Sequence, residues 1–195
     1  MMQQALTMRK VQALILAAIA VAILAIGLSF NTQTAYAKPV AAPGLAVGET
    51  GTAVAADGTV YTLKNKSGSQ GLTVIGVKTT AKNLKIPESI EVNGKVQQIK
   101  AIGTKAFADA KSVTKVTLPK TIYRIEKKAF ANSKVKTLIV KTMKLKKKTV
   151  KGSLKGSKVK TVQVKVGNKK LNKKYVAKYK KIFTKKNCGK KVTVK

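Results

Sequence analysis

The sequence contains no histidine, no tryptophan and a single cysteine in 195 residues. Without imidazole, histidine-based metal sites and the Ser-His or Cys-His pairs of nucleophilic enzymes are excluded. One cysteine, Cys188, also excludes a disulfide within the chain. The lysines around Cys188 could lower the pKa of its thiol, but no partner base accompanies it. We expect a free thiol there, with pairing between two molecules as the alternative.

Acidic residues are scarce as well, since six of them face 41 basic residues and the formal net charge is +35. Glu88 and Glu91 are three residues apart, but they follow Pro87 and lead into a predicted strand, so they need not share one face. Hydrolysis of a glycoside needs two carboxylates in a cleft and in different environments. No glycine-rich segment carries the Lys-Ser/Thr pair of a phosphate-binding loop. We therefore expect no enzyme, no catalytic residue, no metal site and no cofactor.

A repeated pattern is present instead. Residues 102–107 read IGTKAF and are followed by VTKVTLP at 113–119. The pattern returns as IEKKAF at 125–130, and Phe107 to Phe130 is 23 residues. A third copy aligns 157–165 with 133–141 at a spacing of 24 residues. A fixed period in the twenties indicates a solenoid.

Within each copy, apolar residues two positions apart predict a short strand with one buried face. Such a strand cannot bury that face alone, so stacked copies are expected to form a parallel ladder, with the Ala-Phe pair filling the interior behind it. In the third copy Ser153-Leu154 replaces Ala-Phe, so a thinner core is expected there. The predicted core residues are Ile102, Phe107, Val116, Leu118, Ile125, Phe130, Leu138, Val140, Leu154, Val162 and Val164.

The segment IGTKAF followed by VTKVTLP resembles the BspA-like leucine-rich repeats of bacterial surface proteins. The resemblance is specific over residues 86–142 and looser over 143–195. It implies alternating strands and short helical turns in an exported, non-enzymatic protein of a family often associated with attachment to hosts or surfaces. The chain departs from the pattern where Glu126 stands in place of the glycine found at Gly103, and only three copies are legible.

The first 37 residues read as a cleavable signal peptide. Residues 9–10 are basic, residues 11–28 form an apolar run, and Ala35 and Ala37 provide the small-x-small pattern that signal peptidase accepts. The expected location is therefore secreted or at the cell surface. The alternative is an uncleaved membrane anchor, because the apolar run approaches the roughly 20 residues that span a bilayer.

The remaining chain divides into four expected parts. Residues 38–56 are rich in Ala, Pro and Gly and predict a flexible leader. Residues 57–100 predict a β-hairpin cap for the open end of the solenoid, with a tight turn at Asn-Gly. Three repeats occupy 101–166, and a helix-strand cap with an amphipathic helix occupies 167–195. The predicted fold class is thus mainly β with short helices, a short leucine-rich-repeat-type solenoid; a helix lying on a membrane is the alternative for the C-terminal part.

The positive charge predicts polyanionic partners, such as teichoic acid, anionic polysaccharide or glycosaminoglycan. Nearly all of it is lysine, a mobile and strongly hydrated point charge, so we expect loose, salt-sensitive binding. The lysines beside the repeat strands are the predicted contacts: Lys136, Lys141, Lys160 and Lys165. One alternative is a nucleic-acid-binding protein, which the scarcity of arginine and of aromatic residues disfavours. Another is a structural envelope protein whose lysines only solvate its surface. No protein partner is indicated, and a membrane contact is expected only through an uncleaved signal segment.

Overall fold

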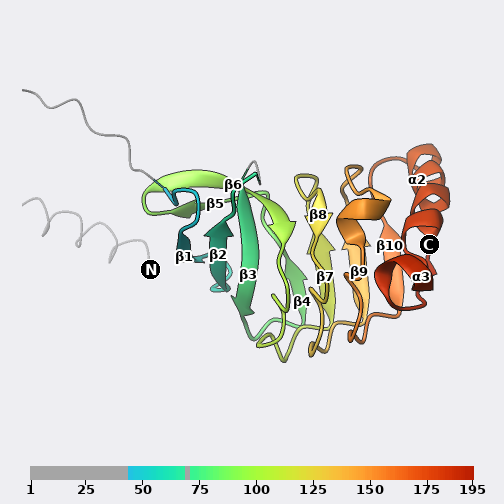
Figure 1. Ribbon diagram of the computed structural model, residues 1–195, viewed down its shortest axis with the longest axis horizontal. Helices are drawn as coiled ribbons and strands as arrows, with labels where there is room; N and C mark the ends of the chain where they lie inside the picture. Colours follow the sequence, from blue (N-terminus) through green and yellow to red (C-terminus); the bar gives the residue numbers. More distant parts are fainter. Residues whose placement is uncertain (1–43, 69–70) are drawn as a thin grey trace, which may run out of the picture. The chain divides into compact units, whose positions relative to one another are not determined.

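A computed structural model describes residues 44–68 and 71–195 of the chain (Figure 1). The predicted signal peptide, its cleavage residues Ala35 and Ala37, and the start of the predicted leader lie outside the described residues. The elements are β1 (Thr50–Val54), β2 (Val60–Asn65), β3 (Leu72–Lys78), β4 (Asn83–Lys85), β5 (Ser89–Val92), β6 (Lys95–Ile102), β7 (Lys115–Leu118), β8 (Arg124–Ile125), β9 (Thr137–Val140), the 3₁₀-helix η1 (Lys147–Val150), β10 (Thr161–Val164), α2 (Lys169–Ile182), α3 (Lys185–Cys188) and β11 (Thr193–Val194).

The main ladder is a parallel sheet in the order β4-β7-β9-β10-β11. Its register places Val116, Leu138 and Val162 side by side on neighbouring strands. Val116 to Leu138 is 22 residues and Leu138 to Val162 is 24, so one turn of the chain separates each strand from the next. Each turn is one coil of a solenoid, and the predicted fold class is confirmed.

The two terminal coils of the main ladder are longer than the middle ones. Leu84 to Val116 and Val162 to Val194 are each 32 residues, by the same register. The first interval contains the antiparallel hairpin β5–β6, and the last contains α2. Insertions at the ends give each terminal coil extra apolar surface with which to cover the core.

A second ladder runs along another side of the coils. β3, β6 and β8 are parallel, with Val74 opposite Ile102 and Ile102 opposite Ile125. β1 and β2 extend this sheet beyond β3 as an antiparallel meander. The N-terminal strands therefore join the solenoid by continuing one of its sheets, so that β3 has a paired neighbour on each side.

A row of left-handed residues marks the turn of each coil. Lys105, Lys128 and Gly152 have φ of 55°, 59° and 66°. The N–H of Lys105 donates to the Lys128 carbonyl (3.1 Å), that of Lys128 to Gly152 (2.9 Å), and that of Gly152 to Asn187 (2.7 Å). The same left-handed position therefore occurs in three successive coils, and the series of hydrogen bonds ends on Asn187 of α3.

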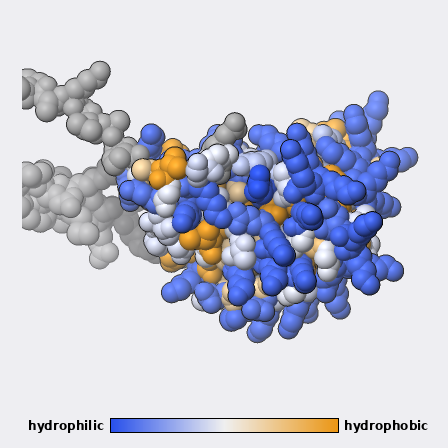
Figure 2. All heavy atoms as spheres, viewed as in Figure 1, coloured by the Kyte–Doolittle hydropathy of each residue, from blue (hydrophilic) through white to orange (hydrophobic). Residues whose placement is uncertain are grey.

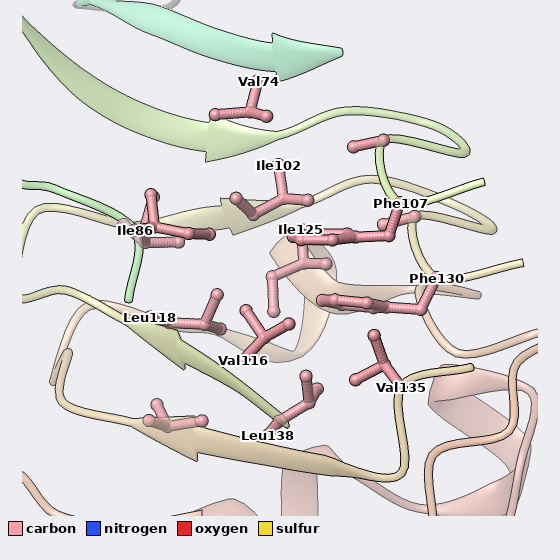
Figure 3. Packing of buried hydrophobic residues seen from close by; sticks show 14 of the residues in the cluster. Val74, Ile86, Ile102, Phe107, Val116, Leu118, Ile125, Phe130, Val135 and Leu138 are labelled. Atoms are coloured by element: carbon pink, nitrogen blue, oxygen red, sulfur yellow. The ribbon is translucent and has the colours of Figure 1, made fainter. Parts of the chain in front are cut away.

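The interior is filled level by level. Figure 3 shows Phe107 and Phe130 one above the other, with Ile102 and Ile125 beside them. Leu154 follows at the next level, where its N–H donates to the Cys188 carbonyl (2.9 Å), so α3 continues the column. All eleven residues predicted to form the core are buried, none above 5% exposed.

The predicted flexible leader is wrong for its second half. Residues 50–54 form β1, which pairs with β2 from Thr50–Lys64 to Val54–Val60. Leu45 is buried and its N–H donates to Oε1 of Gln97 (2.8 Å). A Cβ on Gly51 would lie 2.7 Å from Leu45 Cδ2, so the glycine permits this close packing. The strand was missed because its own sequence has no period and its order depends on pairing with β2.

The boundary between the predicted hairpin cap and the repeats also differs in the structure. β4 lies within 57–100, yet it pairs with β7 as the first strand of the main ladder, with Leu84 opposite Val116. Three residues are too few to show an alternating pattern. The hairpin turn at Asn93 and Gly94 lies where the sequence indicates, with φ of 50° and 71°; both residues adopt the positive φ that a tight primed turn demands.

Candidate polyanion-binding surface

The positive charge is concentrated in the C-terminal part of the chain. Residues 127–195 contain 26 lysines and no acidic residue. The last carboxylate of the sequence, Glu126, pairs with Lys66 (2.7 Å) and accepts hydrogen bonds from the N–H and hydroxyl of Thr104. It is therefore engaged within the N-terminal half of the solenoid. The last two coils and the helices that follow carry no acidic residue of their own to offset their charge.

The four lysines predicted to contact a polyanion lie at the ends of β9 and β10. The N–H of Lys160 donates to the Lys136 carbonyl (2.8 Å), so these two residues are neighbours on adjacent coils. Lys165 donates in the same way to Val140, the residue before Lys141 (2.9 Å). All four lysine side chains are exposed. They form two pairs that flank the strands, with coils about 4.8 Å apart in the hydrogen-bonding direction.

Between these pairs the main ladder presents a half-buried outer surface. Thr137 lies opposite Thr161, and Ile139 opposite Gln163. None of these side chains carries a charge, and Thr137 and Thr161 present hydroxyl groups at the spacing of the strands. We name this surface, with its four flanking lysines, the strand face.

A second lysine-rich feature lies between η1 and the two C-terminal helices, and sequence reasoning missed it. A hollow of about 500 Å³ is lined by Lys147, Lys148, Lys151, Lys181, Thr184, Lys186 and Asn187. An adjoining hollow of about 560 Å³ is lined by Lys146, Lys147, Ala177, Lys178, Lys181 and Ile182. The two share Lys147 and Lys181 in their linings, so they adjoin, and we name them together the lysine groove. Figure 2 shows hydrophilic side chains covering the end of the domain that carries α2 and α3.

The walls of the lysine groove are fixed by specific hydrogen bonds. The side-chain amide of Asn187 donates to the Lys147 carbonyl of η1 (3.0 Å) and to the Ile182 carbonyl of α2 (2.8 Å). Tyr179 of α2 is fully buried, and its hydroxyl donates to the Thr142 carbonyl. At the start of α2, Oδ1 of Asn168 accepts from the Leu171 N–H (2.9 Å) and caps the helix. These hydrogen bonds hold η1, α2 and α3 in fixed positions, so the shape of the groove is set by the fold.

Cys188 corrects one expectation from the sequence. Its thiol is buried, and burial raises its pKa, although hydrogen bonds to backbone groups oppose this. Sγ lies 3.0 Å from the carbonyl oxygen of Thr184 and 3.1 Å from that of Lys190, and its one S–H can donate to either of them. The surrounding lysines do not bring the thiol pKa below its ordinary value, because Lys185, Lys186 and Lys191 are exposed while the thiol lies in the core. The thiol is free, and its burial disfavours the alternative of pairing between molecules.

Two further features bear on the site. Among the residues that the structure describes, no cluster of three or more Cys, Asp or Glu side chains is arranged to hold a metal ion. No helix in that part of the chain has the length and apolar character needed to cross a bilayer.

The stacked parallel coils and their turn pattern define a leucine-rich-repeat solenoid. Residues 78–188 match the family described as "BspA type Leucine rich repeat region (6 copies)". Because this match covers more than half of the chain, the chain belongs to that family, and the resemblance found in its motifs is confirmed. The matched region begins before the three predicted repeats and ends within the predicted C-terminal cap.

Two solved structures are similar to this chain. One is a leucine-rich cell surface protein from Faecalibacterium prausnitzii, with 18% identity and a TM-score of 0.39 over 58% of this chain and 27% of that one. The other is a leucine-rich repeat protein from Bacteroides ovatus, with 19% identity and a TM-score of 0.39 over 52% and 30%. This chain spans less than a third of the length of either protein. No curated protein matches it.

Proposed function

We propose that this chain is an exported, non-enzymatic repeat protein that binds anionic polymers through lysines and is thereby retained at the cell envelope or on an anionic surface. The observation that carries this proposal is the charge of residues 127–195, a segment that contains 26 lysines and no acidic residue. Like charges held together repel one another, and a bound polyanion relieves that repulsion.

Export is supported by two independent features. The first 37 residues combine a basic start, an apolar run and the Ala35–Ala37 pattern. Membership of the BspA type family points in the same direction, and one similar structure carries the description of a cell surface protein. In an exported protein the available polyanions are teichoic acid, anionic polysaccharide and glycosaminoglycan.

The strand face offers contacts that suit such polymers. Its lysines stand in two pairs on adjacent coils, and they present point charges and no planar fork. Recognition of this kind is electrostatic and tolerant of chemistry. Affinity should fall steeply with salt, with a slope of roughly 0.9 per phosphate contact for duplex DNA.

The proposal is tested by fractionation and by binding to immobilised polyanions. The protein should be found outside the cytoplasm, begin at or near Lys38, and remain on heparin or teichoic acid resin at physiological salt. A variant with Lys136→Glu, Lys141→Glu, Lys160→Glu and Lys165→Glu should leave the envelope at a lower salt concentration than the wild type does. Cytoplasmic location would favour nucleic-acid binding, and elution of the wild type below physiological salt would favour lysines that serve only solubility.

A further inference from the structure

The lysine groove has the form of a binding site for an elongated ligand. Its two hollows, each about 500 to 560 Å³, meet along Lys147 and Lys181. Hollows of this size fall in the range that holds small molecules in proteins. Here they adjoin and open to the surface, so a chain could pass from one to the other.

No anionic side chain lines the groove. Seven lysines, one threonine hydroxyl and one asparagine amide supply its polar groups. Lys181 lies in the last turn of α2, where the helix dipole favours a positive charge. The lysines of η1 and α3 have no acidic neighbour in sequence, because none follows Glu126. Their charges are therefore available to an external anion.

Apolar groups form the rest of the lining. Ala177 and Ile182 contribute side chains, and the lysine stems add methylene groups. Neither hollow is lined by an aromatic ring or an arginine. Bases bind proteins largely by stacking on aromatic rings or on guanidinium planes, so this lining does not suit a nucleic acid. It suits a chain with an aliphatic backbone.

The kind of cation narrows the kind of anion. Arginine forks bind carboxylates and phosphates alike with two parallel hydrogen bonds, whereas lysine binds phosphate as a mobile point charge and needs no fixed planar geometry. A groove with seven lysines and no arginine therefore suits phosphate groups carried by a flexible chain, which need no rigid bidentate partner. Flexible ammonium groups on both walls can follow phosphates repeated along a chain.

We infer that the lysine groove binds a linear phosphodiester polymer without bases, of the polyol-phosphate type, with its phosphates between the lysines of η1 and those of α2 and α3. This inference rests on the proposed binding of anionic polymers and specifies its site and ligand class. The strand face then adds weaker contacts, because its lysines flank a ladder of strands and line neither of these two hollows.

Two variants of equal charge test the location of the site. The groove variant carries Lys147→Gln, Lys151→Gln, Lys181→Gln and Lys186→Gln. The strand-face variant carries Lys136→Gln, Lys141→Gln, Lys160→Gln and Lys165→Gln. All eight side chains are exposed, so both variants should keep the wild-type circular dichroism spectrum. Each variant loses four charges, and any difference between them reports position and not net charge.

Binding of fluorescent poly(glycerol phosphate) is measured by anisotropy near 150 mM salt. The groove variant should bind at least about tenfold more weakly than the wild type, and the strand-face variant only about twofold to threefold. Equal losses in both variants, or a larger loss in the strand-face variant, would overturn the groove assignment and leave the proposed function intact. If the wild type binds neither this polymer nor heparin, the proposed function itself fails.

Two competitor ligands test the ligand class. A thymidylate oligomer and a dextran sulfate, each with the same number of charges, should compete less well than unlabelled poly(glycerol phosphate). Tighter binding of the thymidylate oligomer would show a nucleic-acid site, and tighter binding of dextran sulfate would show a site for sulfated glycans. Either result would overturn the inference.

Discussion

The rings of Phe107 and Phe130 stack with their centroids 4.9 Å apart and their planes 13° from parallel. Both side chains are fully buried, and they come from the same position of two successive coils. The distance between the rings is close to the spacing of the strands in the main ladder. The stack is thus a direct consequence of the repeat, since the residue that fills one coil meets its own counterpart in the next.

Phe130→Ala tests this column. The substitution removes a ring that fills the second coil and leaves a cavity beneath Phe107, so the free energy of unfolding should fall by about 3 to 5 kcal/mol. Phe130→Leu is the control, since Leu154 fills the equivalent place one coil further on. In urea denaturation, Phe130→Leu should lose less free energy of unfolding than Phe130→Ala. Equal losses in the two variants would contradict the role of the ring.

Lys128→Gly should be neutral or stabilising by up to about 1 kcal/mol, because Lys128 has φ of 59° and an L-residue is strained there. The equivalent residue of the next coil, Gly152, is already glycine. Lys134→Gly is the matched control, since it removes the same charge at an exposed position without positive φ. It should destabilise by about 0.5 to 1 kcal/mol, through the greater entropy of unfolded glycine. The stability of both variants is measured by thermal unfolding. An equal loss of stability in the two variants would be inconsistent with strain at Lys128.

The repeats could be predicted from the sequence because each coil of a solenoid needs the same residue types at the same places, which gives the sequence a fixed period. Phe107, Phe130 and the strand residues that follow them are local signals, and each copy confirms the others. The hairpin turn at Asn93-Gly94 was equally visible, since the two residues define the turn by themselves. In these segments, local preference and overall fold agree.

Two kinds of feature were not predictable from the sequence. β1 and β4 are strands only because β2 and β7 lie beside them, and neither carries a pattern of its own. The lysine groove is formed by residues about 35 positions apart on η1 and α2, such as Lys147 and Lys181. The lysine run at 146–148 was a signal in the sequence, but nothing in its pattern indicated which segment faces it.

Alkaline pH should destabilise the fold because it deprotonates a buried thiol and two buried phenols. Burial raises the pKa of the Cys188 thiol and of the Tyr61 and Tyr179 phenols. Because the pKa of each group is higher in the folded state, the neutral group contributes fully to stability at any pH below the ordinary pKa of that group. This contribution is lost as pH rises beyond about 9 for the thiol and about 10 for the phenols.

Cys188→Ala isolates the part of this loss that belongs to the thiol. The free energy of unfolding of the wild type should fall more steeply than that of the variant between about pH 8 and about pH 10. Deprotonation of lysines affects both proteins alike and cancels in the comparison. Parallel pH profiles from urea titrations would show that the thiol is not held neutral by the fold.

Stability should increase with salt, in contrast to a protein held together by surface ion pairs. The repulsion among the lysines of residues 127–195 acts in the folded state and is screened within about 10 Å at 0.1 M salt. Screening also weakens the pair between Lys66 and Glu126, but a partly exposed pair contributes at most about 1 kcal/mol. The melting temperature should therefore rise by several degrees between about 0.02 M and about 0.5 M NaCl. The strand-face and groove variants, each with four charges fewer, should show a smaller rise; a melting temperature that falls with salt would mean that ion pairs outweigh the repulsion.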